Sequence, residues 1–216
     1  MHATINAAEI PYVRQWRGAR LSPVEEMLMF HKDAGPVPDT LSRLQAALEK
    51  EGIDYVVIGA LAMGVHHARR ATEDVDLCLR PADLKRFRDK LVGSVYQAVE
   101  GRSRRFYDPQ TQVTFDLLVS GEIAGHRGRN KTIRFPDPAE AVEIAGLRTV
   151  SLEQLIALKL VTWRLQDWAD VVRLIRENKL IEEFSQRLPK EIHAAYLQCH
   201  DQMLEEQRYD EEHGGT

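Results

Sequence analysis

Residues 53–62 read Ile-Asp-Tyr-Val-Val-Ile-Gly-Ala-Leu-Ala, and residues 70–77 read Arg-Ala-Thr-Glu-Asp-Val-Asp-Leu. The first stretch is a β-branched and aromatic run that ends at Gly59 and continues into helix-compatible residues. This pattern predicts a strand, a tight turn and a helix. The second stretch predicts another strand, in which alternate side chains point to the same face of the sheet. We therefore expect Asp74 and Asp76 side by side.

A third acidic residue lies in a later predicted strand, residues 113–119, where Asp116 interrupts an apolar alternation and faces away from Phe115. Neighbouring carboxylates repel one another and are costly to bury unless a cation neutralises them. Their hard oxygen atoms suit Mg²⁺ or Mn²⁺. If the strand of Asp116 lies beside that of Asp74 and Asp76, the three carboxylates can hold two ions roughly 3.5–4 Å apart, as in phosphoryl transfer. These aspartates are the candidate catalytic and metal-binding residues.

Residues around this pattern are candidates for binding phosphate groups. Arg70 and Thr72 continue the every-second-residue alternation, and the planar guanidinium of Arg70 suits a phosphate. The turn at Gly59 and Ala60 offers backbone N–H groups at the start of a helix, where polyphosphate is readily held. Lys159 is an isolated cation in an apolar helical stretch, so we expect it either to reach the triphosphate or to extend along the helices into solvent.

The chain of 216 residues divides by pattern into three parts. Residues 1–38 are punctuated by prolines and predict an N-terminal extension. Residues 39–150 predict an α+β catalytic core, a small mixed β-sheet with flanking helices. Residues 151–216 predict a helical C-terminal bundle, which Ser151 and Gln154 open with a capping-box spacing.

Composition excludes several classes of protein. The chain is 44% hydrophobic and 29% charged, its formal net charge is −4, and no apolar run approaches the roughly 18–20 residues needed to cross a bilayer. Because the N-terminus lacks a secretory pattern, we expect a cytoplasmic protein without membrane contact. Two cysteines, Cys78 and Cys199, are too few for a disulfide framework and are expected to be plain thiols.

The motifs together resemble a known family. Gly-Ala-x-Ala at residues 59–62, followed by Arg-x-Thr-x-Asp-Val-Asp-Leu at residues 70–77, is similar to the signature of the minimal nucleotidyltransferases of the DNA-polymerase-β-like superfamily, and most similar to the AbiEii-type toxin branch. The resemblance covers residues 53–170. It includes Ser-Leu-Glu-Gln-Leu-Ile-Ala-Leu-Lys at residues 151–159 and Arg-x-x-Asp-x-x-Asp at residues 164–170.

The resemblance implies a reaction, a cofactor and partners. A nucleoside monophosphate would pass from an NTP to an acceptor hydroxyl with release of pyrophosphate, and Mg²⁺ or Mn²⁺ would be bound by Asp74, Asp76 and Asp116. By the same resemblance, Lys159 contacts the nucleotide phosphates and Asp167 lies near the nucleotide or the acceptor. The acceptor would be RNA such as tRNA, and an antitoxin protein would be the cognate partner.

Two departures from the family pattern leave alternatives open. Ala60 stands where many members carry serine or glycine, which removes a hydroxyl from the phosphate site, and Gln166 replaces a lysine. One alternative is therefore a catalytically lapsed member that binds a nucleotide or a protein partner without turnover. Another is an enzyme that modifies an antibiotic or a small metabolite, for which we expect an acidic cleft for a cationic acceptor.

Two basic clusters flank the strand of Asp116. They would either line a groove for RNA or another phosphate-bearing acceptor, or belong to solvated loops. The clusters are Arg102, Arg104 and Arg105, and Arg127, Arg129 and Lys131.

Overall fold

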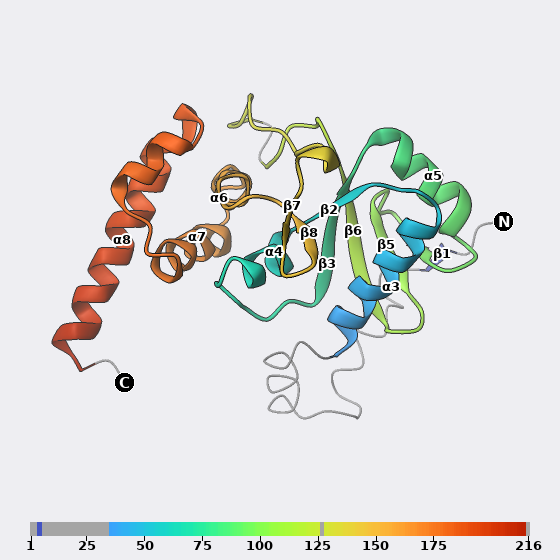
Figure 1. Ribbon diagram of the computed structural model, residues 1–216, viewed down its shortest axis with the longest axis horizontal. Helices are drawn as coiled ribbons and strands as arrows, with labels where there is room; N and C mark the ends of the chain where they lie inside the picture. Colours follow the sequence, from blue (N-terminus) through green and yellow to red (C-terminus); the bar gives the residue numbers. More distant parts are fainter. Residues whose placement is uncertain (1–3, 6–34, 126–127, 215–216) are drawn as a thin grey trace.

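The computed structural model describes residues 4–5, 35–125 and 128–214 (Figure 1). The helices are α3 (Pro36–Lys50), α4 (Gly59–Val65), α5 (Pro81–Leu91), α6 (Leu152–Leu160), α7 (Leu165–Glu177) and α8 (His193–Glu212). Short 3-10 helices are η2 (Pro138–Glu140), η3 (Glu182–Arg187) and η4 (Lys190–Ile192). The strands are β1 (Thr4–Ile5), β2 (Tyr55–Ile58), β3 (Asp74–Leu79), β4 (Gln97–Val99), β5 (Arg105–Asp108), β6 (Val113–Val119), β7 (Val142–Ile144) and β8 (Leu147–Thr149).

The described strands form one mixed sheet in the order β1-β4-β5-β6-β3-β2-β8-β7. At its centre β3 and β6 run parallel, whereas β2 pairs with β3 and β5 pairs with β6 in the antiparallel sense. The predicted α+β class with a mixed sheet and flanking helices is confirmed. The sheet is larger than predicted because the β7–β8 hairpin was not anticipated. Its turn residues Ala145 and Gly146 both have positive φ, without the usual Asn-Gly or Asp-Gly signal.

Helices cover both faces of the sheet (Figure 1). On one face, α3 and α5 contribute Leu48 and Phe87 to a hydrophobic cluster with Leu77 of β3 and Phe115 of β6. On the other face, α4 packs against β2 and β3, and α6, α7 and α8 follow outwards in a second cluster that includes Val56 of β2. The alternation of β3 and β6 therefore places apolar residues towards α3 and α5, and Asp74, Asp76 and Asp116 towards the other side.

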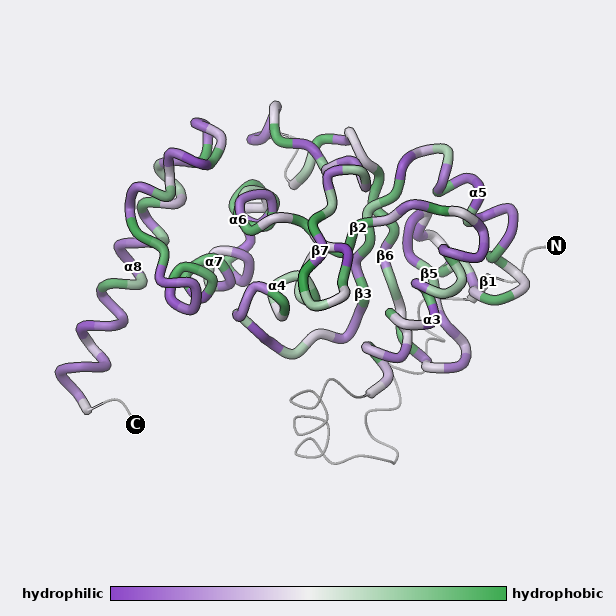
Figure 2. The backbone as a smooth tube through the Cα atoms, viewed as in Figure 1, coloured by the Kyte–Doolittle hydropathy of each residue, from purple (hydrophilic) through white to green (hydrophobic). Residues whose placement is uncertain are grey.

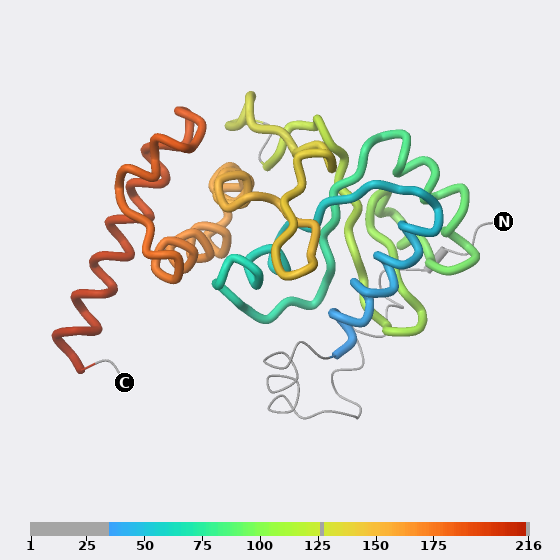
Figure 3. Tube along the Cα trace, in the orientation of Figure 1, coloured from blue at the N-terminus to red at the C-terminus, as the bar shows by residue number. Residues whose placement is uncertain are grey.

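The C-terminal helices share their core with the sheet. Ile58 of β2 and Met63 of α4 lie in the same hydrophobic cluster as Leu160 of α6, Val171 of α7 and Tyr196 of α8. Figure 3 follows the chain from α3 through the sheet to α8 at the opposite side of the molecule. The boundary at residue 150 stays a prediction, and the shared core holds α6 beside α4.

The first long helix begins earlier than the sequence predicts, and the last helix is buried over only part of its length. Most of the predicted extension 1–38 lies outside the described residues, but α3 already begins at Pro36, since proline is well tolerated in a first helical turn. In α8 the buried residues are Tyr196, Cys199 and Met203, and the rest of the helix to its end is largely hydrophilic (Figure 2). No helix among the described residues is both long and apolar enough to cross a lipid bilayer.

Candidate metal centre

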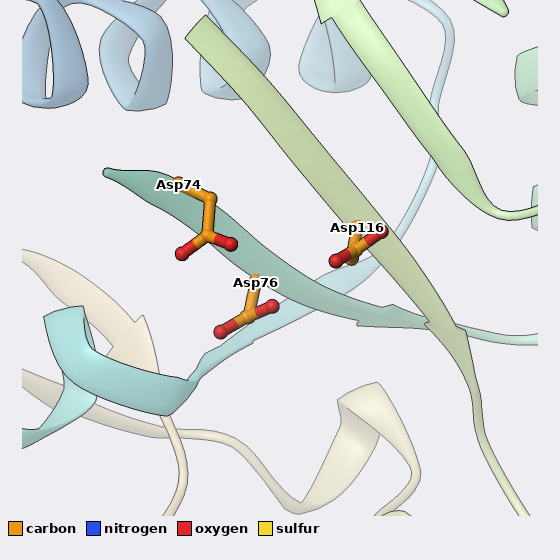
Figure 4. Close-up of side chains that lie close together, drawn as sticks. All are labelled: Asp74, Asp76 and Asp116. Atoms are coloured by element: carbon orange, nitrogen blue, oxygen red, sulfur yellow. The ribbon is translucent and has the colours of Figure 1, made fainter. Parts of the chain in front are cut away.

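Three carboxylates converge on one face of the sheet (Figure 4). Asp74 and Asp76 lie on β3, and the β3–β6 register places Asp76 directly opposite Asp116. One carboxylate oxygen of each residue lies within 4.8 Å of the others. All three side chains are partly exposed, so an ion can reach them from solvent. The donor set of three hard, closely spaced oxygen atoms fits Mg²⁺ or Mn²⁺.

The electrostatics of the three aspartates favour a cation at this position. Burial, together with the negative charges of Asp74 and Asp116, raises the pKa of Asp76 to about 7, although Lys159 and Arg105 oppose the shift. Burial also raises the pKa of Asp116, where Arg105 opposes it and Asp74 adds to it. The protein thus holds carboxylates whose ionised form is destabilised, and a divalent ion would compensate this cost.

Gly59 permits the close approach of Asp76 to the turn between β2 and α4. The φ of Gly59 is +69°, and a Cβ at this position would lie 2.2 Å from Oδ2 of Asp76. A side chain is therefore excluded both by the backbone conformation and by the carboxylate. Gly59, predicted from sequence to form a phosphate-binding turn, lets the carboxylate of Asp76 lie against the backbone.

Arg105 of β5 contacts two of the three carboxylates. Its Nη2 atom donates to Oδ2 of Asp74 at 3.2 Å and to Oγ1 of Thr114 at 2.9 Å. Its Nη1 atom lies 3.5 Å from Oδ2 of Asp116. The sequence indicated Arg105 only as part of a basic cluster. The signal that would have found this contact is the β5–β6 register, in which Arg105 and Asp116 are direct partners.

The segment before β3 does not continue the strand, contrary to the alternation inferred from sequence. β3 begins at Asp74, and residues 68–73 form no strand. Thr72 nevertheless contacts the site, since its hydroxyl donates to Oδ1 of Asp74 at 3.2 Å. Arg70 lies elsewhere, where its Nε atom is 3.0 Å from Oδ1 of Asp170 on α7. Free of the sheet's hydrogen bonds, this segment turns towards α7.

Lys159 is buried in an ionic network between α6 and α7. Its Nζ atom lies 3.1 Å from Oδ1 of Asp167 and 2.6 Å from Oδ2 of Asp170. Burial raises the pKa of Asp167, but Lys159 and hydrogen bonds from Thr162 and Arg164 outweigh it and lower the pKa overall. Lys159 does not extend into solvent, the alternative left open by the sequence. Its charge lies close enough to Asp76 to lower the pKa of that carboxyl.

The basic clusters are divided among several partners. Arg104 forms a two-pronged ion pair with Glu122 at 2.5 and 2.6 Å. The guanidinium of Arg129 stacks over the ring of Trp163 at 4.6 Å. Arg127 lies outside the described residues. Gln166, one of the two departures from the family pattern, lies on α7 and donates its side-chain amide to Asp170 at 3.2 Å.

Comparison with known proteins places the chain near several solved structures. No family model and no curated protein matches this chain. A solution structure of the antibiotic-resistance factor ANT(2'')-Ia is 13% identical, with a TM-score of 0.44 over 80% of this chain and 95% of that one. A crystal structure of ANT(2'')-Ia in complex with adenylyl-2''-tobramycin is 16% identical, with a TM-score of 0.46 over 74% and 96%.

A third similar structure is that of JHP933 from Helicobacter pylori. It is 12% identical, with a TM-score of 0.30 over 78% of this chain and 94% of that one.

Proposed function

We propose that this protein is a metal-dependent nucleotidyltransferase of the DNA-polymerase-β-like type. It would move a nucleoside monophosphate from an NTP to an acceptor hydroxyl and release pyrophosphate. The observation that carries the proposal is the convergence of Asp74, Asp76 and Asp116 within 4.8 Å on one face of the sheet. The pKa values of Asp76 and Asp116 are raised, so their ionised carboxylates are destabilised and a bound cation would relieve this cost.

The aspartates would supply both binding and proton transfer. Divalent ions, when bound, stabilise the attacking and leaving oxygens of phosphoryl transfer. Asp74 and Asp76 would hold the ions, and Asp116 would complete the ligand set. The raised pKa of Asp116 also suits it to accept the proton of the acceptor hydroxyl. The hydroxyl oxygen then bonds to the α-phosphorus while the bond from that phosphorus to the pyrophosphate oxygen breaks.

The nucleotide would lie between the β2–α4 turn and the ionic network of α6 and α7. The first backbone N–H groups of α4, at Gly59 and Ala60, have no partner within that helix and would face the phosphates. Thr72 would fix the rotamer of Asp74 through its hydrogen bond. Arg70 and Lys159 would bind the phosphates by giving up a contact with Asp170 or Asp167 and donating to a phosphate oxygen instead.

Asp167 would control the exchange at Lys159. It now accepts from Lys159, from Thr162 at 2.7 Å and from Arg164 at 2.6 Å. With the other two donors in place, Asp167 stays satisfied while the lysine ammonium turns towards a nucleotide. Asp167 is thus proposed to act on the nucleotide through Lys159.

For the acceptor we propose RNA, because Arg102 makes the surroundings of Asp116 basic. Arg102 acts electrostatically on Asp116, so a phosphate-bearing acceptor approaching this carboxylate would meet its guanidinium group. A cationic small molecule would be favoured as acceptor only if the surface leading to Asp116 were acidic. The toxin role and an antitoxin partner rest on the sequence resemblance alone.

The test is transfer of label from each α-labelled NTP in the presence of Mg²⁺, with total RNA in one arm and a mixture of aminoglycosides in the other. We expect labelled RNA from the wild type and from the control Glu73→Gln, whose side chain is exposed beside the site. We expect none from Asp76→Asn. Label on the aminoglycosides alone would replace the RNA acceptor with a small one. Nucleotide binding without transfer in either arm would support a lapsed enzyme instead.

A further inference from the structure

Arg105 lies between the carboxylates of the proposed metal site. Its two terminal nitrogen atoms reach different residues, Asp74 at 3.2 Å and Asp116 at 3.5 Å. The hydroxyl of Thr114 accepts a further hydrogen bond at 2.9 Å and orients the guanidinium. No other cationic side chain of the described residues is shown within ion-pairing distance of either carboxylate.

The position of Arg105 follows from the sheet. β5 and β6 are antiparallel, and their register makes Arg105 the direct partner of Asp116, so the two side chains emerge on the same face. The preceding residue, Arg104, pairs with Glu122 instead. The two adjacent arginines carry the same charge but have different partners, so Arg104 is a matched control for Arg105.

The guanidinium supplies part of the charge that a divalent ion would supply. A cation held by Asp74 and Asp116 would compete with Arg105 for the same two carboxylates. The side chains of Arg105, Asp74 and Asp116 are 36%, 31% and 28% exposed, so the guanidinium has room to leave without crossing the core. Its planar fork is also suited to phosphate oxygens.

We propose that Arg105 is an exchangeable counterion of the metal site, which couples the binding of metal to the binding of NTP. Without NTP, Arg105 competes with divalent ions for Asp74 and Asp116 and weakens their binding. With NTP, Arg105 turns from the carboxylates to the triphosphate, and the metal then binds without competition. This inference rests on the proposed function, and it adds that bound NTP raises the affinity for metal and bound metal raises the affinity for NTP.

The test measures Mn²⁺ binding by electron paramagnetic resonance, with and without a non-hydrolysable NTP analogue. Arg105→Gln should bind Mn²⁺ alone about tenfold more tightly than the wild type, since the competing hydrogen bond to Asp74 and the ion pair with Asp116 are gone. The analogue should raise the Mn²⁺ affinity of the wild type by at least about fivefold more than that of Arg105→Gln. Arg105→Lys keeps the charge and should lie between the two.

The outcomes separate this inference from the proposed function. Arg104→Gln should leave Mn²⁺ affinity unchanged, and circular dichroism confirms that each variant is folded. Equal Mn²⁺ affinity in the wild type and Arg105→Gln, or weaker binding in Arg105→Gln, would overturn the counterion role while the metal site stands. If neither protein binds Mn²⁺ at millimolar concentration with the analogue present, the proposed function fails and this inference with it.

Discussion

Replacing Asp76 by asparagine should stabilise the metal-free protein while abolishing metal binding. The pKa of Asp76 is raised from 3.8 to about 7, mainly by burial and then by Asp74 and Asp116. A shift of about three pKa units corresponds to roughly 4 kcal/mol as an upper limit for the cost of ionising this group in the folded state. Asparagine removes that cost but leaves a polar amide in the same place, so we expect a net gain of about 1–3 kcal/mol.

The sign and the pH range follow from linkage. The pKa of Asp76 is higher in the folded than in the unfolded state, so the carboxyl loses its proton more readily when the protein unfolds. Above the pKa of the unfolded state, this difference lowers the stability of the fold. The penalty is absent below pH 3.8, grows as pH rises, and is complete above about pH 7. Relative to the wild type, the advantage of Asp76→Asn should therefore be largest at pH 8 and less than half as large at pH 5.

The assay is thermal unfolding in EDTA at these two pH values. For a chain of this size, 1 kcal/mol corresponds to roughly 2–4 °C, so the midpoint at pH 8 should rise by about 2–12 °C in Asp76→Asn. Glu73→Gln, an exposed neighbour, should change it little. A lower midpoint in Asp76→Asn, with the same decrease at both pH values, would refute the claim that the ionised carboxylate is held at a cost.

Three further predictions concern the same region. Mg²⁺ at a hundred times its dissociation constant should stabilise the wild type by about 2.7 kcal/mol in calorimetry, and an equal response in Asp76→Asn would place the ion elsewhere. Gly59→Ala should unfold at lower temperature and lose Mn²⁺ binding, because its Cβ would lie 2.2 Å from Oδ2 of Asp76; unchanged binding would show that the turn can adjust. Lys159→Met should lower the free energy of unfolding, measured by chemical denaturation, by about 3–5 kcal/mol, because two buried aspartates lose their shared cation. Unchanged stability would assign Lys159 to phosphate binding alone.

The aspartates were predictable because their placement depends on local pattern. Alternation along a strand puts Asp74 and Asp76 on one face whatever the rest of the chain does. The isolated acid at Asp116 within an apolar strand indicated a second strand of the same site. The parallel β3–β6 register that brings them together is a pairing between distant segments, and the sequence pattern could only suggest it.

The contacts of the cations were not predictable in the same way. The role of Arg105 depends on the register of the β5–β6 hairpin, and the partners of Lys159 depend on how α6 packs on α7. Arg70 followed the alternation in sequence, but the strand begins only at Asp74, so its side chain reaches α7. In each case tertiary packing, which a one-dimensional pattern does not encode, decided where a long flexible side chain found its partner.

An anomalous difference map from crystals grown with Mn²⁺ and a non-hydrolysable NTP shows whether the three aspartates bind metal. We expect a Mn²⁺ peak at about 2.1 Å from oxygen atoms of Asp74, Asp76 and Asp116, with phosphate oxygens of the nucleotide as further ligands. Ordered nucleotide without a peak among these three carboxylates would rule out the proposed metal site.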